Sequence, residues 1–155
     1  MRVMGLDPGS RSTGYGIVEE MGGRISYISD GVISPPGGIP ERLKGLYLGI
    51  KEALSIYRPE VVAVESPFLA KNVQSTMRLG QVQGVIFLAA AESHLGVYEY
   101  SPMEVKVALT GYGRASKNQV REMVKRFLSL DRSLSLDASD ALAVAICHIH
   151  TAWMK

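Results

Sequence analysis

Four acidic residues occupy positions from which their carboxylates can reach a common reaction centre. Asp7 and Glu65 each end a short apolar run, and Asp137 and Asp140 lie three residues apart at the start of a predicted helix. That spacing places the two aspartates on one helical face. Clustered carboxylates repel one another unless cations lie between them, and ligand sets made only of oxygen favour Mg²⁺ or Mn²⁺.

These acids suit the hydrolysis of phosphodiesters. Two divalent ions about 3.5–4 Å apart can hold the attacking water and the leaving oxygen in line. Taken singly, the acids have simpler explanations: Asp7 precedes Pro8 and Gly9 and would serve a turn, while Asp137 or Asp140 would cap a helix. Neither explanation accounts for acids at two strand ends and on one helix face.

Five strands and five helices are predicted to position the acids. Three early strands joined by tight turns indicate an antiparallel meander, and a later β-branched run indicates a parallel strand reached through a helical crossover. We therefore predict an α/β fold with a mixed five-stranded sheet flanked by helices, in which Asp7 and Glu65 share one sheet edge. The predicted strands cover 3–6, 15–18, 25–33, 61–64 and 97–100, and the predicted helices 41–58, 73–94, 101–110, 116–127 and 137–153.

The composition is that of a folded cytosolic domain. The chain has 155 residues, of which 46% are hydrophobic, and this predicts a single domain over 1–155. A net charge of +2 neither requires nor excludes nucleic acid. The single cysteine excludes an internal disulfide and fits a reducing compartment. The longest apolar stretch, 84–91, is too short to cross a bilayer, so we expect a soluble cytoplasmic protein without a membrane partner.

Basic residues cluster between the second acid and the last pair. Each one alone would be a solvated surface charge. Lys117 differs because it follows a glycine-containing loop at a helix start, where free N–H groups attract phosphate, and Arg114 lies in the same loop. Phe68, after Glu65, is either a core residue or a face for stacking on an unpaired base. The candidate DNA-binding residues are Phe68, Lys71, Arg78, Lys106, Arg114 and Lys117.

The histidines near the only cysteine do not predict a second metal site. Cys147, His148 and His150 lack the spacing of a standard zinc site. We expect the two histidines to be cationic, because they lie near the carboxyl end of a predicted helix, where the helix dipole favours positive charge.

Six ordered motifs run through nearly the whole chain. Together they resemble the RuvC family of Holliday-junction resolvases, which are dimeric endonucleases with a ribonuclease H-like fold. One motif alone would be weak, whereas six in order are specific. The motifs are GLDPGSRSTGYG at 5–16, VAVESPF at 62–68, a spaced AKN…S…LGQ…G at 70–84, SPMEVK at 101–106, GYGRASKNQV at 111–120 and DASDALAVAICHIH at 137–150.

The resemblance implies a metal site built from the four acids. Asp7, Glu65, Asp137 and Asp140 match the acidic tetrad of the family, which binds Mg²⁺. We expect two ions per active site, with Mn²⁺ as an alternative. Within the site, we expect Asp7 to bridge the ions, Glu65 and Asp137 to hold one each, and Asp140 to complete the set or to orient water.

The resemblance also implies DNA contacts and partners. It predicts that Phe68 contacts or wedges into the opened junction and that Lys106 and Lys117 meet the DNA backbone. Pro67 stands where we expect an ordinary apolar residue, and proline restricts the residue before it. A branch-migration complex of RuvA and RuvB is the implied protein partner.

We expect a homodimeric endonuclease that cuts two strands of a four-way DNA junction symmetrically during recombination and DNA repair. A two-fold arrangement of subunits suits a substrate with near two-fold symmetry. The apolar helix around Val82–Ala91 is the predicted dimer contact.

Three other functions fit parts of the pattern. An actin-like or sugar-kinase-like phosphotransferase also has an acid and glycines after an early strand, but it needs a second domain for which 155 residues leave no room. A non-catalytic junction-binding scaffold needs basic residues and Phe68, but not all four acids. A related ribonuclease H-like nuclease acting on RNA is the alternative that the sequence separates least well.

Overall fold

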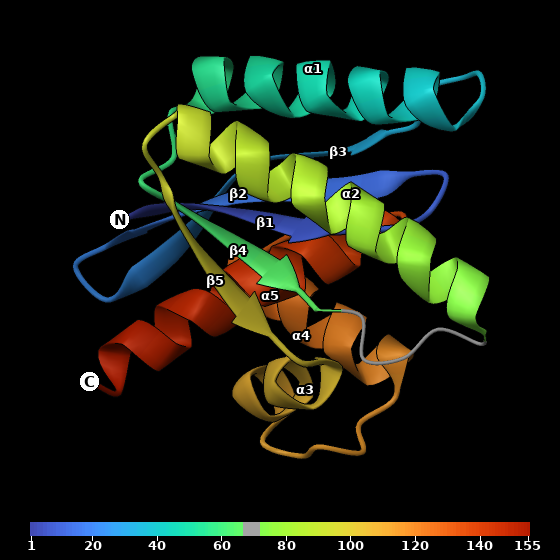
Figure 1. The fold of residues 1–155 in the computed structure, drawn as a ribbon. Helices are drawn as coiled ribbons and strands as arrows, with labels where there is room; N and C mark the ends of the chain where they lie inside the picture. The colour runs from blue at the N-terminus through green and yellow to red at the C-terminus, as the bar shows by residue number, and fades with distance from the viewer. Residues whose placement is uncertain (67–71) are drawn as a thin grey trace.

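A five-stranded mixed sheet lies at the centre of the molecule (Figure 1). The computed structural model describes residues 1–66 and 72–155. Its strands are β1 (Arg2–Asp7), β2 (Thr13–Met21), β3 (Arg24–Ile33), β4 (Val61–Glu65) and β5 (Gly96–Tyr100). Their order is β3-β2-β1-β4-β5, with β1 to β3 antiparallel and β4 and β5 parallel to β1. The predicted mixed sheet is therefore confirmed.

Helices cover both faces of the sheet (Figure 1). One face carries α1 (Ile39–Tyr57) and α2 (Val73–Glu92), and the other carries α3 (Pro102–Thr110), α4 (Lys117–Leu128) and α5 (Leu136–Trp153). Successive side chains of β1 point to opposite faces of the sheet. Met4 and Leu6 pack in the core under α1 and α2, and Val3 packs in the core under α3, α4 and α5. All five helices begin within two residues of their predicted starts. The helix predicted over 73–94 ends at Glu92, because His94 adopts a left-handed conformation with φ of 57°.

The α5 helix is buried along most of its length and lies directly on β1 and β2. A Cβ at Gly5 of β1 would overlap the carbonyl oxygen of Ala141, and a Cβ at Gly14 of β2 would overlap the backbone of Asp137. These glycines carry no side chain, so the helix backbone approaches the strands closely. This contact brings the first turns of α5 to the end of β1.

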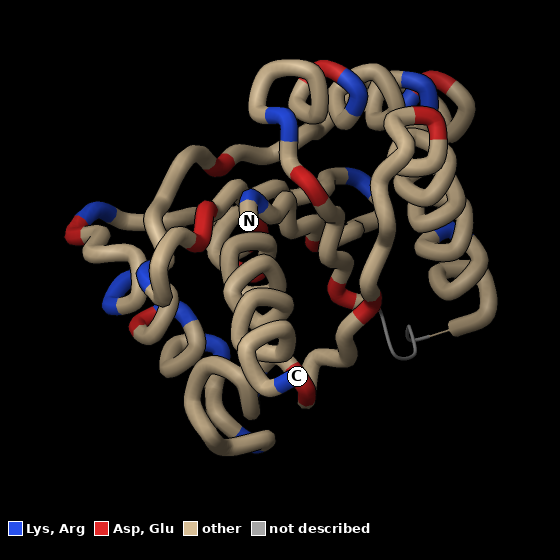
Figure 2. The backbone as a smooth tube through the Cα atoms, turned by 90° about the vertical axis from the view of Figure 1, so that its left-hand side faces the viewer, with Lys and Arg blue, Asp and Glu red and all other residues tan. Residues whose placement is uncertain are grey.

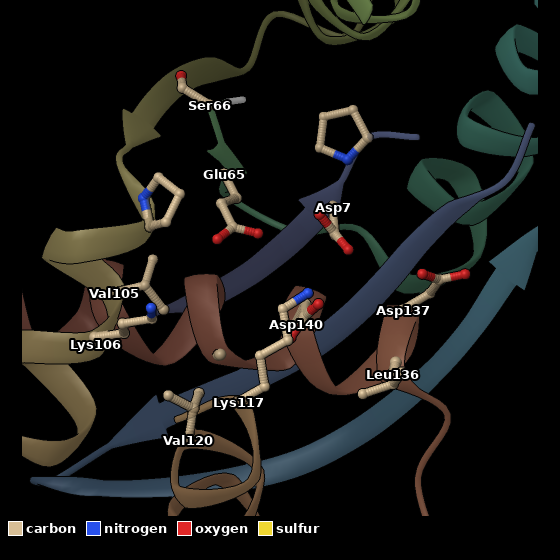
Figure 3. A pocket seen from close by; sticks show the side chains of 13 residues that line it. Asp7, Glu65, Ser66, Val105, Lys106, Lys117, Val120, Leu136, Asp137 and Asp140 are labelled. Carbon is tan, nitrogen blue, oxygen red and sulfur yellow. The ribbon is translucent and has the colours of Figure 1, made fainter. Parts of the chain in front are cut away.

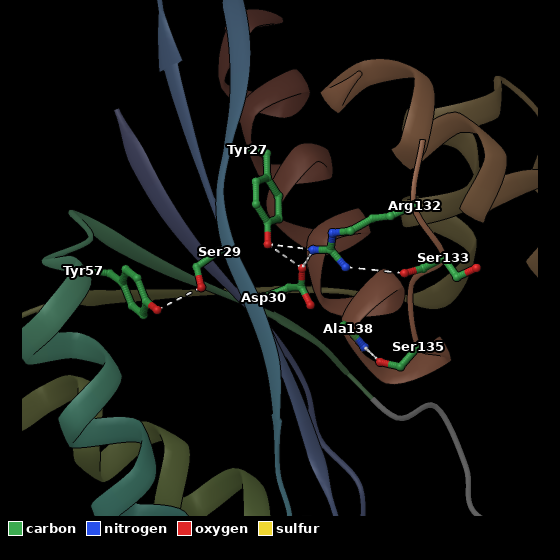
Figure 4. A network of polar contacts seen from close by, with 8 residues as sticks. All are labelled: Tyr27, Ser29, Asp30, Tyr57, Arg132, Ser133, Ser135 and Ala138. Carbon is green, nitrogen blue, oxygen red and sulfur yellow. Dashed lines mark hydrogen bonds and ion pairs between the residues drawn. The ribbon is translucent and has the colours of Figure 1, made fainter. Parts of the chain in front are cut away.

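The segment before α5 is anchored at two points. The backbone N–H of Ala138 donates to Ser135 Oγ at 3.2 Å, so a serine rather than an aspartate caps the helix. Upstream, Arg132 forms an ion pair with Asp30 of β3 and donates to the hydroxyl of Tyr27 at 2.7 Å (Figure 4). The start of α5 is thereby tied to the sheet, and its aspartates are free for another role.

The opposite face is built from large apolar side chains. Leu46 and Ile50 of α1 and Ile86 of α2 are buried in the same core as Met4 and Leu6. Part of α2 nevertheless stays exposed, and this surface includes Met77, Phe87 and Leu88. Among the described residues, every helix is too short or too polar to span a bilayer.

Candidate active site

Three carboxylates meet where β1 and β4 end against the first turns of α5 (Figure 3). Parallel pairing of β1 with β4 puts Asp7 beside Glu65, and Asp140 reaches them from the helix. One carboxylate oxygen from each of the three lies within 4.8 Å of the other two. We call Asp7, Glu65 and Asp140 the acidic triad. The triad lines a cavity of about 380 Å³ and stays partly exposed to solvent.

Burial and mutual repulsion favour protonation within the acidic triad. Removal from water, followed by the charges of Glu65 and Asp140, raises the pKa of Asp7 to about 8. Burial also raises the pKa of Glu65 and of Asp140, although the positive charge of Lys117 opposes both rises. A cation that displaced these protons would relieve the repulsion among the three carboxylates.

The donor set fits a hard divalent cation. Within 1–66 and 72–155, the acidic triad is the one group of histidine, cysteine or acidic side chains arranged to hold a metal ion. All its ligand atoms are oxygens, which favours Mg²⁺ or Mn²⁺ over softer metals. Cys147 is buried elsewhere, and burial raises the pKa of its thiol to about 12, so it offers no thiolate ligand at neutral pH.

Asp137 lines the same cavity but lies outside the acidic triad. Its Oδ2 accepts a hydrogen bond of 3.2 Å from the hydroxyl of Ser12, in the loop between β1 and β2. The four predicted acids therefore surround one cavity. Asp140 joins Asp7 and Glu65 in the close group of carboxylate oxygens, whereas Asp137 does not.

Two lysines of the predicted DNA-binding set line the cavity. Lys106 comes from α3, and Lys117 from the first turn of α4 (Figure 3). Arg121, one turn further along α4, contributes a positive charge that opposes the rise in the pKa of Asp140. Positive side chains beside an acidic centre can hold phosphate oxygens that the carboxylates alone would repel.

Two other predicted DNA contacts, among the described residues, lie outside the lining of this cavity. Arg78 of α2 lines a separate small depression, and Arg114 is exposed in the loop between α3 and α4. Predictions about Pro67, Phe68 and Lys71 lie outside the described residues. Figure 2 shows Lys and Arg on both helical layers, interspersed with Asp and Glu, so the positive charge at the cavity is a local feature.

Two residues near the cavity are absent from the predicted site. Ser12 lies 125 positions from its partner Asp137, and no spacing in the sequence connects them. Arg121 does have a signal, since it follows Lys117 by four residues and therefore shares its helical face.

His148 corrects one prediction. The residue is buried, its Nδ1 lies 2.7 Å from the hydroxyl of Tyr100, and burial lowers its pKa. The prediction of a cationic His148 is wrong, because the cost of burying a charge outweighs the helix dipole. His148 is neutral near physiological pH.

Several relatives of this chain share the description of the family that matches it. The family described as crossover junction endodeoxyribonuclease RuvC matches residues 3–148. A protein of that description from Polynucleobacter asymbioticus is 50% identical, and the match covers 97% of this chain and 89% of the relative. Another from Geobacter sulfurreducens is 47% identical over 100% of this chain and 96% of the relative.

Solved structures agree with this match. RuvC from Thermus thermophilus, in complex with a Holliday junction substrate, has a TM-score of 0.94 and 34% identity, covering 99% of this chain and 96% of its own. The yeast mitochondrial Holliday junction resolvase has a TM-score of 0.70 at 16% identity, covering 96% of this chain and 77% of its own, and shows only a shared fold. The chain therefore belongs to the crossover junction endodeoxyribonuclease RuvC family.

Proposed function

We propose that this protein is a metal-dependent endonuclease that resolves four-way DNA junctions by paired, symmetric phosphodiester hydrolysis during recombination and DNA repair. The observation that carries the proposal is the acidic triad, whose oxygens lie within 4.8 Å of one another beside two cavity lysines. The family match supplies the substrate class, since the Thermus thermophilus relative is described in complex with a Holliday junction.

The four acids are the proposed ligands of two Mg²⁺ ions, with Mn²⁺ as an alternative. When bound, such ions activate a water and neutralise charge on the scissile phosphate. Asp7 belongs to the acidic triad and lies between Glu65 and Asp137 in Figure 3, so it would be the ligand shared by both ions. Glu65 and Asp140 would bind the first ion together with Asp7, inside the acidic triad. Asp137 would bind the second ion, at what we call the outer cation position.

The lysines of the cavity are proposed to hold the DNA backbone. Lys106 and Lys117 lie on the same cavity as the acids, so each can pair with a phosphate next to the cleaved bond. Arg78 and Arg114 are proposed as more distant backbone contacts, and Phe68 and Lys71 as contacts to the opened junction. These contacts would orient the phosphodiester, whereas the acids would act on it.

The exposed surface of α2 is the proposed dimer contact. Met77 and Leu88 expose 63% and 56% of their surface, and Phe87 exposes 38%. Val82 and Ile86 face inward, so Phe87 and Leu88 form the outer side of the segment around Val82–Ala91, and Met77 extends the exposed surface towards the start of the helix. A large apolar surface of this kind is stabilised by a second subunit, and two subunits would present one active site to each cut strand.

The proposed protein partner and cellular compartment come from the family match. We propose that a branch-migration complex of RuvA and RuvB delivers junctions to the dimer, and that the enzyme works in the cytoplasm. Both proposals rest on the family of the chain.

A cleavage assay tests the proposal. Synthetic four-way junction, linear duplex with the same arm sequences, and an RNA–DNA hybrid are each incubated with the protein, in Mg²⁺ and in chelator. We expect paired nicks at symmetric positions of the junction alone, and no nicks in chelator. The Asp7→Asn variant is the matched control, since it keeps the shape of the side chain and the cavity lysines.

Each other outcome favours a specific alternative. Cleavage of the hybrid with an intact junction would identify a ribonuclease. Tight binding of the junction without nicks, whichever divalent ion is added, would identify a non-catalytic scaffold.

A further inference from the structure

Among the residues that the structure describes, Asp137 is the one acid of the cavity whose carboxylate accepts a hydrogen bond from a hydroxyl. Ser12 Oγ donates to Asp137 Oδ2 at 3.2 Å, across 125 positions of sequence. We propose that Ser12 is a positioning residue, which fixes Asp137 as the ligand of the outer cation position. This inference rests on the proposed function of the four acids as metal ligands.

The loop that carries Ser12 contacts Asp137 at two levels. The Ser12 side chain reaches the carboxylate, and Gly14, two residues later, lies so close to the Asp137 backbone that any Cβ would overlap it. Thr13 between them is buried, with 1% of its surface exposed. The chain at 12–14 therefore holds both the backbone and the side chain of Asp137, which limits the positions that the carboxylate can take.

The hydrogen bond suits a metal ligand better than an ion pair would. A hydroxyl donor orients a carboxylate without adding positive charge, so the carboxylate keeps its full attraction for a cation. The bond engages Oδ2 and leaves Oδ1 without that partner. Hydrogen bonds from residues behind the ligands commonly set ligand orientation, and their loss typically costs about 10- to 100-fold in metal affinity.

The position of Asp137 beside the acidic triad explains why its hydrogen bond with Ser12 would affect the binding of a second ion. The negative charge of Asp137 contributes to the raised pKa of Asp7 and of Asp140, so it is near enough to act on both. It is nevertheless outside the set of oxygens within 4.8 Å. An acid beside the triad, rather than in it, is suited to hold a second ion a few ångströms from the first.

Direct titration with Mn²⁺ tests the inference in the full-length protein, without DNA. Calorimetry on the metal-free protein is expected to show two binding steps. Ser12→Ala is expected to weaken the second step by about 10-fold or more and to leave the first unchanged. Ser12→Thr, which keeps the hydroxyl, is expected to restore most of the loss. Ser10→Ala, an exposed serine in the same loop, is the matched control and should bind as the parent does.

A double-mutant comparison separates positioning from loop stability. In an Asp137→Asn background, Ser12→Ala is expected to have no further effect on Mn²⁺ affinity, because the ligand it orients is gone. An equal loss in both backgrounds, or unchanged affinity in Ser12→Ala with the parent fold retained by circular dichroism, would overturn the inference. A parent protein that binds two Mn²⁺ but leaves junctions intact would instead refute the proposed function and leave the Ser12 contact standing.

Discussion

On one face of the sheet, α5 lies against the glycines of β1 and β2, whereas on the other face α1 and α2 are separated from the strands by Met4, Leu6 and Ile17. The first contact leaves no room for an added methyl group, and it fixes the helix that carries Asp137 and Asp140. The second contact is made by flexible side chains that can adjust. The face with the tighter backbone contact carries the proposed chemistry, and the face with the looser contact carries the exposed apolar surface.

The largest expected effect comes from the first face. Asp7→Asn removes the ligand that all the other acids adjoin, so junction cleavage is expected to fall by about 10³-fold or more. Junction binding, measured in Ca²⁺ or chelator, should be retained because the cavity lysines remain. The metal-free variant should also unfold at a higher temperature, because a repelling carboxyl group is gone. Retained cleavage in Asp7→Asn would contradict the assignment of the site.

A glycine pair compares the two faces directly. Gly5→Ala is expected to destabilise the protein by about 2–3 kcal/mol and to reduce metal affinity, because the new methyl group overlaps the backbone of Ala141. Gly80→Ala, on the exposed side of α2 with open space around it, is expected to stabilise the subunit by up to about 1 kcal/mol. Urea unfolding of both variants provides the measurement, and equal effects would show that the faces do not differ.

The exposed surface of the second face should govern assembly rather than chemistry. Leu88→Glu places a charge at the centre of the proposed dimer contact and is expected to weaken the dimer by about 10²-fold. Sedimentation equilibrium measures the change. Leu48→Glu on α1, which is similarly exposed at 53%, is the matched control. A dimer that survives Leu88→Glu would place the interface elsewhere.

A smaller effect is expected at the rim of the cavity. Lys117→Ala should weaken junction binding by about 10-fold. It should also reduce the slope of log affinity against log salt concentration by about 1, the amount expected for the loss of one phosphate contact. The exposed Lys44→Ala on α1 should change neither quantity. Binding isotherms over a series of salt concentrations measure both, and an unchanged salt slope in Lys117→Ala would remove this lysine from the DNA interface.

The most gradual predicted effect is a pH dependence of the stability of the metal-free protein. Because the pKa of folded Asp7 is raised to about 8, the folded state binds more protons than the unfolded state between about pH 4 and 8. Stability should therefore fall as pH rises through this window, by about 1.4 kcal/mol per pH unit at most, and Asp7→Asn should flatten the slope. Mg²⁺ affinity should rise over the same range, since binding must displace protons. A stability that rises with pH would contradict the raised pKa.

Much of the fold, and the identity of the acids at the site, can be predicted from local sequence. Strand ends at Asp7 and Glu65 follow from apolar runs that stop at acids, and parallel crossover rules then make them neighbours. The shared face of Asp137 and Asp140 follows from helical periodicity. The element order and the mixed sheet could be predicted because each segment has the hydrophobic period of its own structure.

Contacts that depend on three-dimensional proximity could not be predicted in the same way. Nothing near Ser12 in the sequence indicates a bond to Asp137, and nothing near Gly5 indicates that a helix backbone from residue 141 lies on it. The charge of His148 is mispredicted because its local position suggests an effect of the helix dipole, whereas its burial against Tyr98 and Tyr100 of β5 is a tertiary effect. Sequence spacing identifies the acids, and the close packing of α5 on Gly5 and Gly14 determines how near the aspartates of α5 lie to Asp7.

Anomalous diffraction from crystals soaked in Mn²⁺ tests the central claim most directly, because it locates the metal without relying on activity. The account predicts a strong peak among the carboxylates of Asp7, Glu65 and Asp140, and a second peak towards Asp137. Full Mn²⁺ saturation with no anomalous density at this cavity would contradict it.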